Sequence, residues 1–129
     1  MADFMTVEPG QNYDTLAPDG SEIRLLCGVG GGSMVHCTLQ RNQTSTAIRH
    51  KTVEEIWYCI AGEGQVWRRQ GRREKVTDIR PGISLTIPLG THFQFRNCGA
   101  VPLQLLIITM PPWPGADEAV RVAGKWRSQ

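Results

Sequence analysis

The sequence predicts an all-β, antiparallel protein with a single domain, and three observations support that prediction. The 129 residues fit one domain and leave little room for a second. Short apolar runs alternate with turn residues at a spacing of about 8–12 residues, which is typical of a sandwich or barrel. No segment carries a convincing helical pattern of ten residues.

The expected strands follow from these apolar runs. The strongest is Glu55 to Ala61, which is rich in aromatic and β-branched residues. The full set of expected strands is 22–29, 34–40, 44–50, 55–61, 65–69, 75–79, 83–87, 92–96 and 102–110. We therefore expect an N-terminal arm at 1–20, a barrel at 21–112 and a C-terminal tail at 113–129. Prolines 111, 112 and 114 exclude a helix or central strand at the start of that tail.

Composition argues against several kinds of partner. The net charge of +2 comes from 14 basic and 12 acidic residues, which is too balanced to indicate nucleic acid or a membrane surface. No apolar run approaches the roughly 20 residues that span a bilayer. The first residues do not resemble a signal peptide, so we expect a cytoplasmic protein. In that compartment the four cysteines are expected to be free thiols.

One local excess of charge lies at Arg68, Arg69, Arg72, Arg73 and Lys75. It straddles Gln70-Gly71, so it predicts the tip of a hairpin. Such a run of charges is either a solvated loop or a patch that docks an anion, and the sequence leaves both open.

Two motifs carry the information about family. In the first, His50 is followed after four residues by Glu55, and Glu55 after six residues by Gly62. The second motif consists of Gly82, Pro88, Gly90 and Asn97, which follow one another at a characteristic spacing. Together these resemble the two conserved motifs of the cupins. The resemblance covers roughly residues 22–110 and implies the cupin double-stranded β-helix, a jelly-roll barrel.

The resemblance also implies a divalent metal held by three His and one Glu. Two of those four positions carry His50 and Glu55, whereas the other two carry Ile48 and Phe93. His92 lies one residue before the expected place, and only a bulge would turn it inward, because neighbouring side chains on a strand face opposite sides. We therefore expect no cofactor with a full ligand set. A weakly bound divalent metal on His50, Glu55 and His92 is the alternative.

Strand alternation on this template also predicts a ligand pocket. Its walls are expected to be mostly apolar and aromatic with a few polar groups, as in many small-molecule sites. The predicted ligand-binding residues are Thr46, Ile48, His50, Glu55, Trp57, Cys59, Arg68, Phe93 and Phe95. His50 and Glu55 are the candidate catalytic residues, although they could equally form a hydrogen-bonded structural pair. Arg68 would need an anion or a carboxylate such as Glu55.

The function expected from these residues is that of a small-molecule-binding cupin of unknown specificity, with a degenerate or weak metal site. The alternative is a divalent-metal-dependent isomerase, lyase or dioxygenase using His50, Glu55 and His92. A metal-free isomerase or epimerase with His50 as the base is a third class. The resemblance further implies a homodimer, for which the N-terminal arm is suited.

Overall fold

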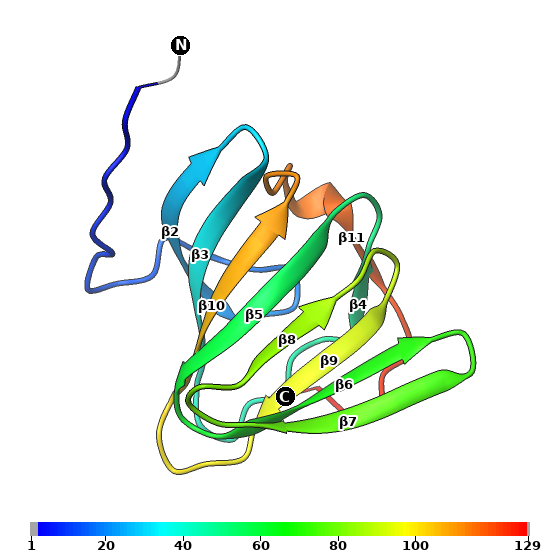
Figure 1. Ribbon diagram of the computed structural model, residues 1–129. Helices are drawn as coiled ribbons and strands as arrows, with labels where there is room; N and C mark the ends of the chain where they lie inside the picture. The colour runs from blue at the N-terminus through cyan, green and yellow to red at the C-terminus, as the bar shows by residue number, and fades with distance from the viewer. Residues whose placement is uncertain (1–2, 129) are drawn as a thin grey trace.

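The computed structural model describes residues 3–128 and consists of two packed antiparallel sheets (Figure 1). The six-stranded sheet has the order β1-β2-β3-β10-β5-β8, and the five-stranded sheet has the order β11-β4-β9-β6-β7. The strands are β1 Thr15–Leu16, β2 Glu22–Val29, β3 Gly32–Leu39, β4 Ile48–His50, β5 Glu54–Ala61, β6 Gly64–Gln70, β7 Arg73–Ile79, β8 Ser84–Ile87, β9 His92–Asn97, β10 Leu103–Met110 and β11 Ala119–Arg121. A 3-10 helix, η1 Ala116–Glu118, precedes β11. The predicted all-β, antiparallel jelly roll is confirmed.

The core lies between the two sheets and follows from strict alternation along the strands. In β5, Glu55, Trp57 and Cys59 are buried, while Ile56 and Tyr58 face outward. Strand β10 alternates in the same way from Leu103 onward. Because side chains on a strand point alternately to opposite faces, each strand gives one row of residues to the core.

The motif residues hold the turns between strands. Gly62 has a φ of 82°, and a Cβ there would lie 2.5 Å from the carbonyl oxygen of Pro102. Asn97 donates to the carbonyl oxygens of Leu39 and Val101 at 3.0 and 2.9 Å, and its side-chain oxygen accepts from the Gly99 N–H. Gly62 and Asn97 therefore hold turns at one end of the barrel, and neither lines its cavity.

The segment predicted as a tail, 113–129, contacts the five-stranded sheet at two places. Its strand β11 pairs with β4, with Ala119 opposite His50, and so extends the five-stranded sheet. Farther on, the Trp126 carbonyl accepts from the Gln94 side chain at 2.7 Å. Part of the expected tail therefore belongs to the sheet: the prolines end β10, and the chain resumes as an edge strand beyond them.

The predicted strand at 44–50 is also shorter in the structure. Only Ile48–His50 is strand, and residues 45, 47 and 48 are all buried, so alternation fails before Ile48. The reason is hydrogen bonding to segments far away in the chain. The Ser45 hydroxyl accepts from the Phe95 N–H at 3.0 Å, and the Thr46 N–H donates to the Asp19 carbonyl at 2.9 Å.

Two further expectations concern the cysteines and membrane-spanning segments. All four cysteines are free, with Cys37 and Cys59 buried, Cys27 half-buried and Cys98 exposed. Among residues 3–128, no helix has the length and apolar character that crossing a membrane requires.

Candidate functional site

A cavity of about 320 Å³ opens between the two sheets, and we call it the barrel cavity. Most of its wall is apolar, with Ile48, Trp57 and Phe93 among the residues that line it. The polar side chains in the wall come from several separate segments: Thr15, Asp19, Ser21, Ser33, His50, Glu55 and Thr109. Such a cavity has the composition of a small-molecule site and a size near the lower end of the usual range.

Three aromatic rings pack together beside the cavity. Trp57 packs edge-to-face against Phe93 and Phe95, with ring centroids 5.4 and 5.1 Å away. Phe95 and Cys59 point inward as strand alternation predicts, but they do not line the cavity. They lie in the closed part of the core, where these rings leave no room for a ligand.

His50 is buried in the cavity wall with an unsatisfied ring nitrogen. Its Nδ1 has no hydrogen-bond partner among the described residues. The ring lies edge-to-face with Phe93 and Trp113, at centroid distances of 5.2 and 5.4 Å. Burial lowers the pKa of His50, and the negative charges of Glu118 and Asp19 only partly oppose this shift. The imidazole is therefore neutral at physiological pH and carries an unmet hydrogen bond.

Glu55 is not the partner of His50. One of its carboxyl oxygens accepts from the Trp57 indole N–H at 3.0 Å, and the other bonds the Thr109 hydroxyl at 2.7 Å. Burial raises the pKa of Glu55, although these two hydrogen bonds favour the ionised form. The predicted structural pair of His50 and Glu55 does not form, because strand neighbours already satisfy both oxygens of the carboxyl group.

Asp19 is a second buried carboxyl group in the same wall. Its Oδ1 accepts from the Ser21 N–H at 2.9 Å and from the Ser21 hydroxyl at 2.7 Å. Burial raises the pKa of Asp19, and the nearby charge of Glu55 adds to the shift. The cavity therefore holds a neutral base and two carboxyl groups that resist ionisation. Such a set can accept and donate single protons or hydrogen bonds, and it disfavours an ionic ligand.

Three residues of this region lie outside the range predicted for the barrel. Asp19 and Trp113 line the cavity, and the charge of Glu118 affects the pKa of His50. Asp19 forms a short turn with Ser21, which the Pro-Asp-Gly sequence signals only as a loop. Trp113 lies among prolines, and its backbone N–H donates to the Ser33 hydroxyl at 3.0 Å. Glu118 accepts from the Thr52 N–H and hydroxyl and from the Val53 N–H. These hydrogen bonds outweigh burial and lower the pKa of Glu118.

Two other predicted residues lie outside the barrel cavity. Thr46 lines a separate, smaller hollow of about 160 Å³, because alternation fails before β4. Arg68 lies opposite Phe93 in the β6–β9 register, but its long side chain reaches a third hollow at the end of the β6–β7 hairpin. There it bonds Thr86 and Thr77, so Glu55 is not its partner.

The donors in the cavity wall do not fit the metal that the resemblance implies. Ile48 and Phe93 pair directly across β4 and β9, and both hydrocarbon side chains line the cavity. His92 pairs with Arg69 in a regular register and is not in the cavity wall, so the set His50, Glu55 and His92 is not assembled. Within residues 3–128, no three His, Cys, Asp or Glu side chains are grouped to hold a metal ion.

The fold is a double-stranded β-helix with a cavity between its two sheets. The family model for the cupin domain matches residues 35–109. The chain therefore belongs to the cupin domain family. It is 29% identical over 118 residues to the uncharacterized protein MJ1618 of Methanocaldococcus jannaschii, a match that covers 84% of this chain and 90% of that one.

Solved structures share the fold at low identity. BH2720 from Bacillus halodurans aligns with a TM-score of 0.66 and 22% identity, over 79% of this chain and 76% of its own. KdgF from Halomonas sp. aligns with a TM-score of 0.68 and 13% identity, over 81% and 89%. Oxalate decarboxylase from Bacillus subtilis, which has Mn(II) centers, aligns with a TM-score of 0.72 and 14% identity, over 87% of this chain and only 30% of its own.

Proposed function

We propose that this cupin binds a small, uncharged and largely apolar molecule that carries one hydrogen-bonding group. The observation that carries the proposal is the buried, unpartnered Nδ1 of His50 in a mostly apolar cavity of about 320 Å³. An unpaired buried polar atom costs roughly 1–3 kcal/mol, so a ligand that bonds it gains affinity. Cytoplasmic location stays part of this proposal, supported by the four free thiols.

The size and charge of the ligand follow from the wall. A water molecule occupies about 30 Å³ in the liquid, so the cavity has room for on the order of ten non-hydrogen atoms. Burial raises the pKa of Asp19 and Glu55, which is evidence that the cavity solvates charge poorly. A ring or branched alkyl body with one hydroxyl, carbonyl or amide group meets these conditions.

Binding is expected to be visible in the tryptophan side chains. Benzyl alcohol is a suitable probe, because it has an apolar ring and one hydroxyl group. Titrating it into the ¹⁵N-labelled protein should shift the indole N–H signals of Trp57 and Trp113, both in the cavity wall. Trp67, bonded to Glu74, and Trp126, under the Arg96 guanidinium, lie elsewhere and should not move. We expect a Kd of about 1 mM for so small a probe.

A pair of variants gives the matched control for this titration. Ile107 lines the cavity, whereas its neighbour Ile108 faces the other side of β10. Ile107→Phe should fill the cavity and abolish the shifts, while Ile108→Phe should preserve them. Shifts spread equally over all four tryptophans, or shifts that survive in Ile107→Phe, would contradict binding in the barrel cavity.

We also propose that the protein is a homodimer. Residues 3–9 extend away from the sheets, and Phe4, Met5 and Val7 are exposed on this arm (Figure 1). The arm rejoins the sheet at Gly10, Gln11 and Asp14, which hydrogen-bond to β2. On the outer face of the six-stranded sheet, Ile56 and Tyr58 form part of a second exposed apolar row. A second copy that covers the arm and this row would remove both from water.

The dimer is tested by light scattering of the full chain at micromolar concentration. The wild-type mass should be twice 14.3 kDa. Ile56→Lys combined with Tyr58→Lys should give a monomer, because a buried interface excludes two new charges. Leu89→Lys, an exposed apolar position on the β8–β9 loop, serves as the control and should stay dimeric. A wild-type protein of monomer mass would refute the proposal.

A further inference from the structure

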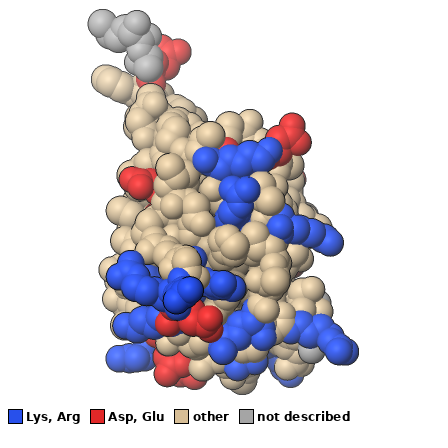
Figure 2. All heavy atoms as spheres, turned by 90° about the vertical axis from the view of Figure 1, so that its right-hand side faces the viewer, with Lys and Arg blue, Asp and Glu red and all other residues tan. Residues whose placement is uncertain are grey.

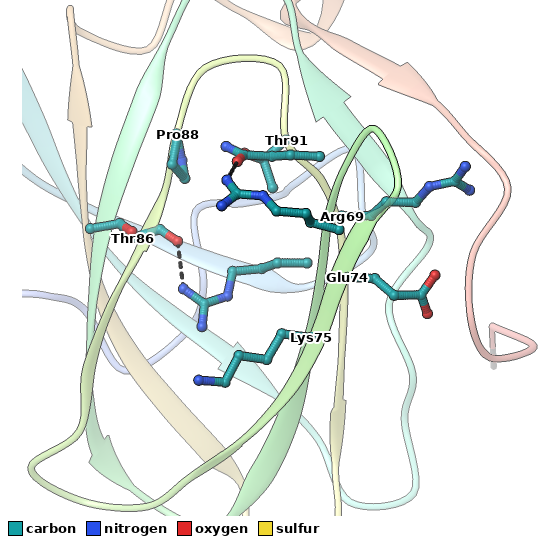
Figure 3. A pocket seen from close by; sticks show the side chains of 9 residues that line it. Arg69, Glu74, Lys75, Thr86, Pro88 and Thr91 are labelled. Atoms are coloured by element: carbon teal, nitrogen blue, oxygen red, sulfur yellow. Dashed lines mark hydrogen bonds between the residues drawn. The ribbon is translucent and has the colours of Figure 1, made fainter.

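The hollow that Arg68 reaches lies between the end of the β6–β7 hairpin and the β8–β9 loop (Figure 3), and we call it the cationic hollow. Its volume is about 370 Å³, and it shares no lining residue with the barrel cavity. The basic side chains in its wall are Arg68, Arg69, Arg73 and Lys75. It is therefore a separate site with a different chemistry.

The strand register places like charges directly opposite each other. Val66, which is fully buried in the core, pairs with Thr77, and the next pair along the hairpin on the same face is Arg68 with Lys75. Two like charges facing each other across a strand pair are destabilising. The inner face of this hairpin thus changes from apolar to cationic as it leaves the core.

Arg69 lies opposite Glu74 in the strand register. The other cations of the wall receive little counter-charge from the protein. Arg68 donates to the Thr86 carbonyl at 3.0 Å and to the Thr77 hydroxyl at 2.9 Å, and both acceptors are neutral. Arg73 donates to the Gln70 side-chain oxygen at 3.0 Å, which is also neutral. Burial lowers the pKa of Arg68, which reflects the cost of holding its charge there.

The one carboxylate in the wall is turned to other partners. Glu74 points away from Lys75 and Thr86 (Figure 3). It accepts from the Trp67 indole N–H at 3.4 Å and pairs with Lys125 at 3.9 Å, which is the one ion pair within residues 3–128. The wider face around the end of the hairpin also carries many Lys and Arg side chains (Figure 2). The face of the hairpin that carries Arg68, Arg73 and Lys75 therefore has no carboxylate of its own.

We propose that the cationic hollow binds the phosphate group of a small phosphorylated molecule. Arginine guanidinium groups present several N–H donors in a plane that matches phosphate oxygens. A phosphate group carries close to two negative charges, which suits a wall with several unpaired cations better than one carboxylate would. Thr91 accepts from Gln70 at 3.1 Å, so its own hydroxyl proton is free to donate to an oxyanion.

The test is calorimetric titration of the full-length protein with inorganic pyrophosphate at low salt. We expect a Kd at or below about 1 mM. Arg73→Gln and Lys75→Gln should each weaken binding about tenfold, because each removes a charge-assisted contact. Arg72→Gln is the matched control. Arg72 lies in the adjacent turn and does not line the hollow, so its loss should change affinity by less than about twofold.

Three results would overturn the proposal. The first is no detectable heat with pyrophosphate, and the second is an equal effect of Arg72→Gln and Arg73→Gln, which would indicate only general attraction to a basic surface. The third is tight binding of a single-stranded oligonucleotide without binding of pyrophosphate. Lys75 is exposed, so Lys75→Gln is expected to fold even if Arg73→Gln does not. The tryptophan shifts with benzyl alcohol should be unchanged in both variants, which separates this site from the barrel cavity.

Discussion

The double variant Ile48→His/Phe93→His is expected to bind one zinc or nickel ion per chain, at least about a thousandfold more tightly than the wild-type protein. The two residues pair across β4 and β9, and both line the barrel cavity with His50 and Glu55. The variant therefore supplies three imidazoles and one carboxylate where the wild type supplies one of each. Transition metals depend strongly on the number of such ligands.

Metal content after dialysis, together with competition against a fluorescent chelator, measures this gain. Each single variant adds one imidazole and should fall between the wild type and the double variant. Circular dichroism must show that the double variant is folded, since both positions are buried. A folded double variant that binds metal no better than the wild type would mean that His50 and Glu55 do not face the same site as residues 48 and 93.

The second large effect concerns pH and the two buried carboxyl groups. Burial raises the pKa of Asp19 above its ordinary value of 3.8 and that of Glu55 above 4.5. A raised pKa in the folded state stabilises the fold fully below the ordinary value, and this contribution is lost as the pH rises through the folded pKa. The wild type therefore loses stability from these groups as the pH rises above about 4, at up to about 1.4 kcal/mol per pH unit for each group.

Asp19→Asn and Glu55→Gln are expected to remove this loss. Both Ser21 hydrogen bonds of Asp19 go to Oδ1, which an asparagine keeps. A glutamine at 55 can still accept from Trp57 and bond Thr109. The melting temperature of each variant relative to the wild type should rise between pH 4 and pH 8, by several degrees if about 1–2 kcal/mol is involved.

His50 does not confound this comparison. Burial lowers the pKa of His50 below 6.5, so its contribution to stability is present above that value and is lost as the pH falls below it. Its effect cancels in the comparison with Glu55→Gln, whereas Asp19→Asn also removes a charge that raises the pKa of His50, so Glu55→Gln is the cleaner of the two variants. Asp78→Asn, at an exposed carboxylate on β7, controls for the change in net charge. A difference in melting temperature that stays constant from pH 4 to pH 8 would contradict burial of the two carboxyl groups.

Much of the fold could be predicted from the sequence because its strands alternate cleanly. The β5 alternation placed Glu55 and Trp57 inside, and the same rule placed Phe93 inside and His92 outside. The pairing of β6 with β9 is regular and contains no bulge that would turn His92 inward and Phe93 outward. Where alternation broke down, as at Thr46, the predicted position was wrong.

The candidate site was only partly predictable, because several of its residues come from segments without periodicity. Asp19 lies in a turn and Trp113 lies among prolines. Neither segment has an alternating pattern from which the direction of a side chain could be predicted. The long side chain of Arg68 lies at an inward register position but ends beyond the core. Contacts between segments far apart in the chain, such as Ser33 with Trp113, decide these cases, and no local pattern encodes them.

We propose that this cupin binds a small organic ligand and lacks the full metal site that the cupin resemblance implies. The most direct test is elemental analysis and native mass spectrometry of untagged protein after dialysis against a mild chelator. We expect no transition metal near one ion per chain, and a barrel cavity that is empty or carries a small organic molecule. Retention of about one zinc, iron, nickel or manganese ion per chain would contradict the claim. If metal is retained, its release by His92→Ala would show that the residue turns inward in solution.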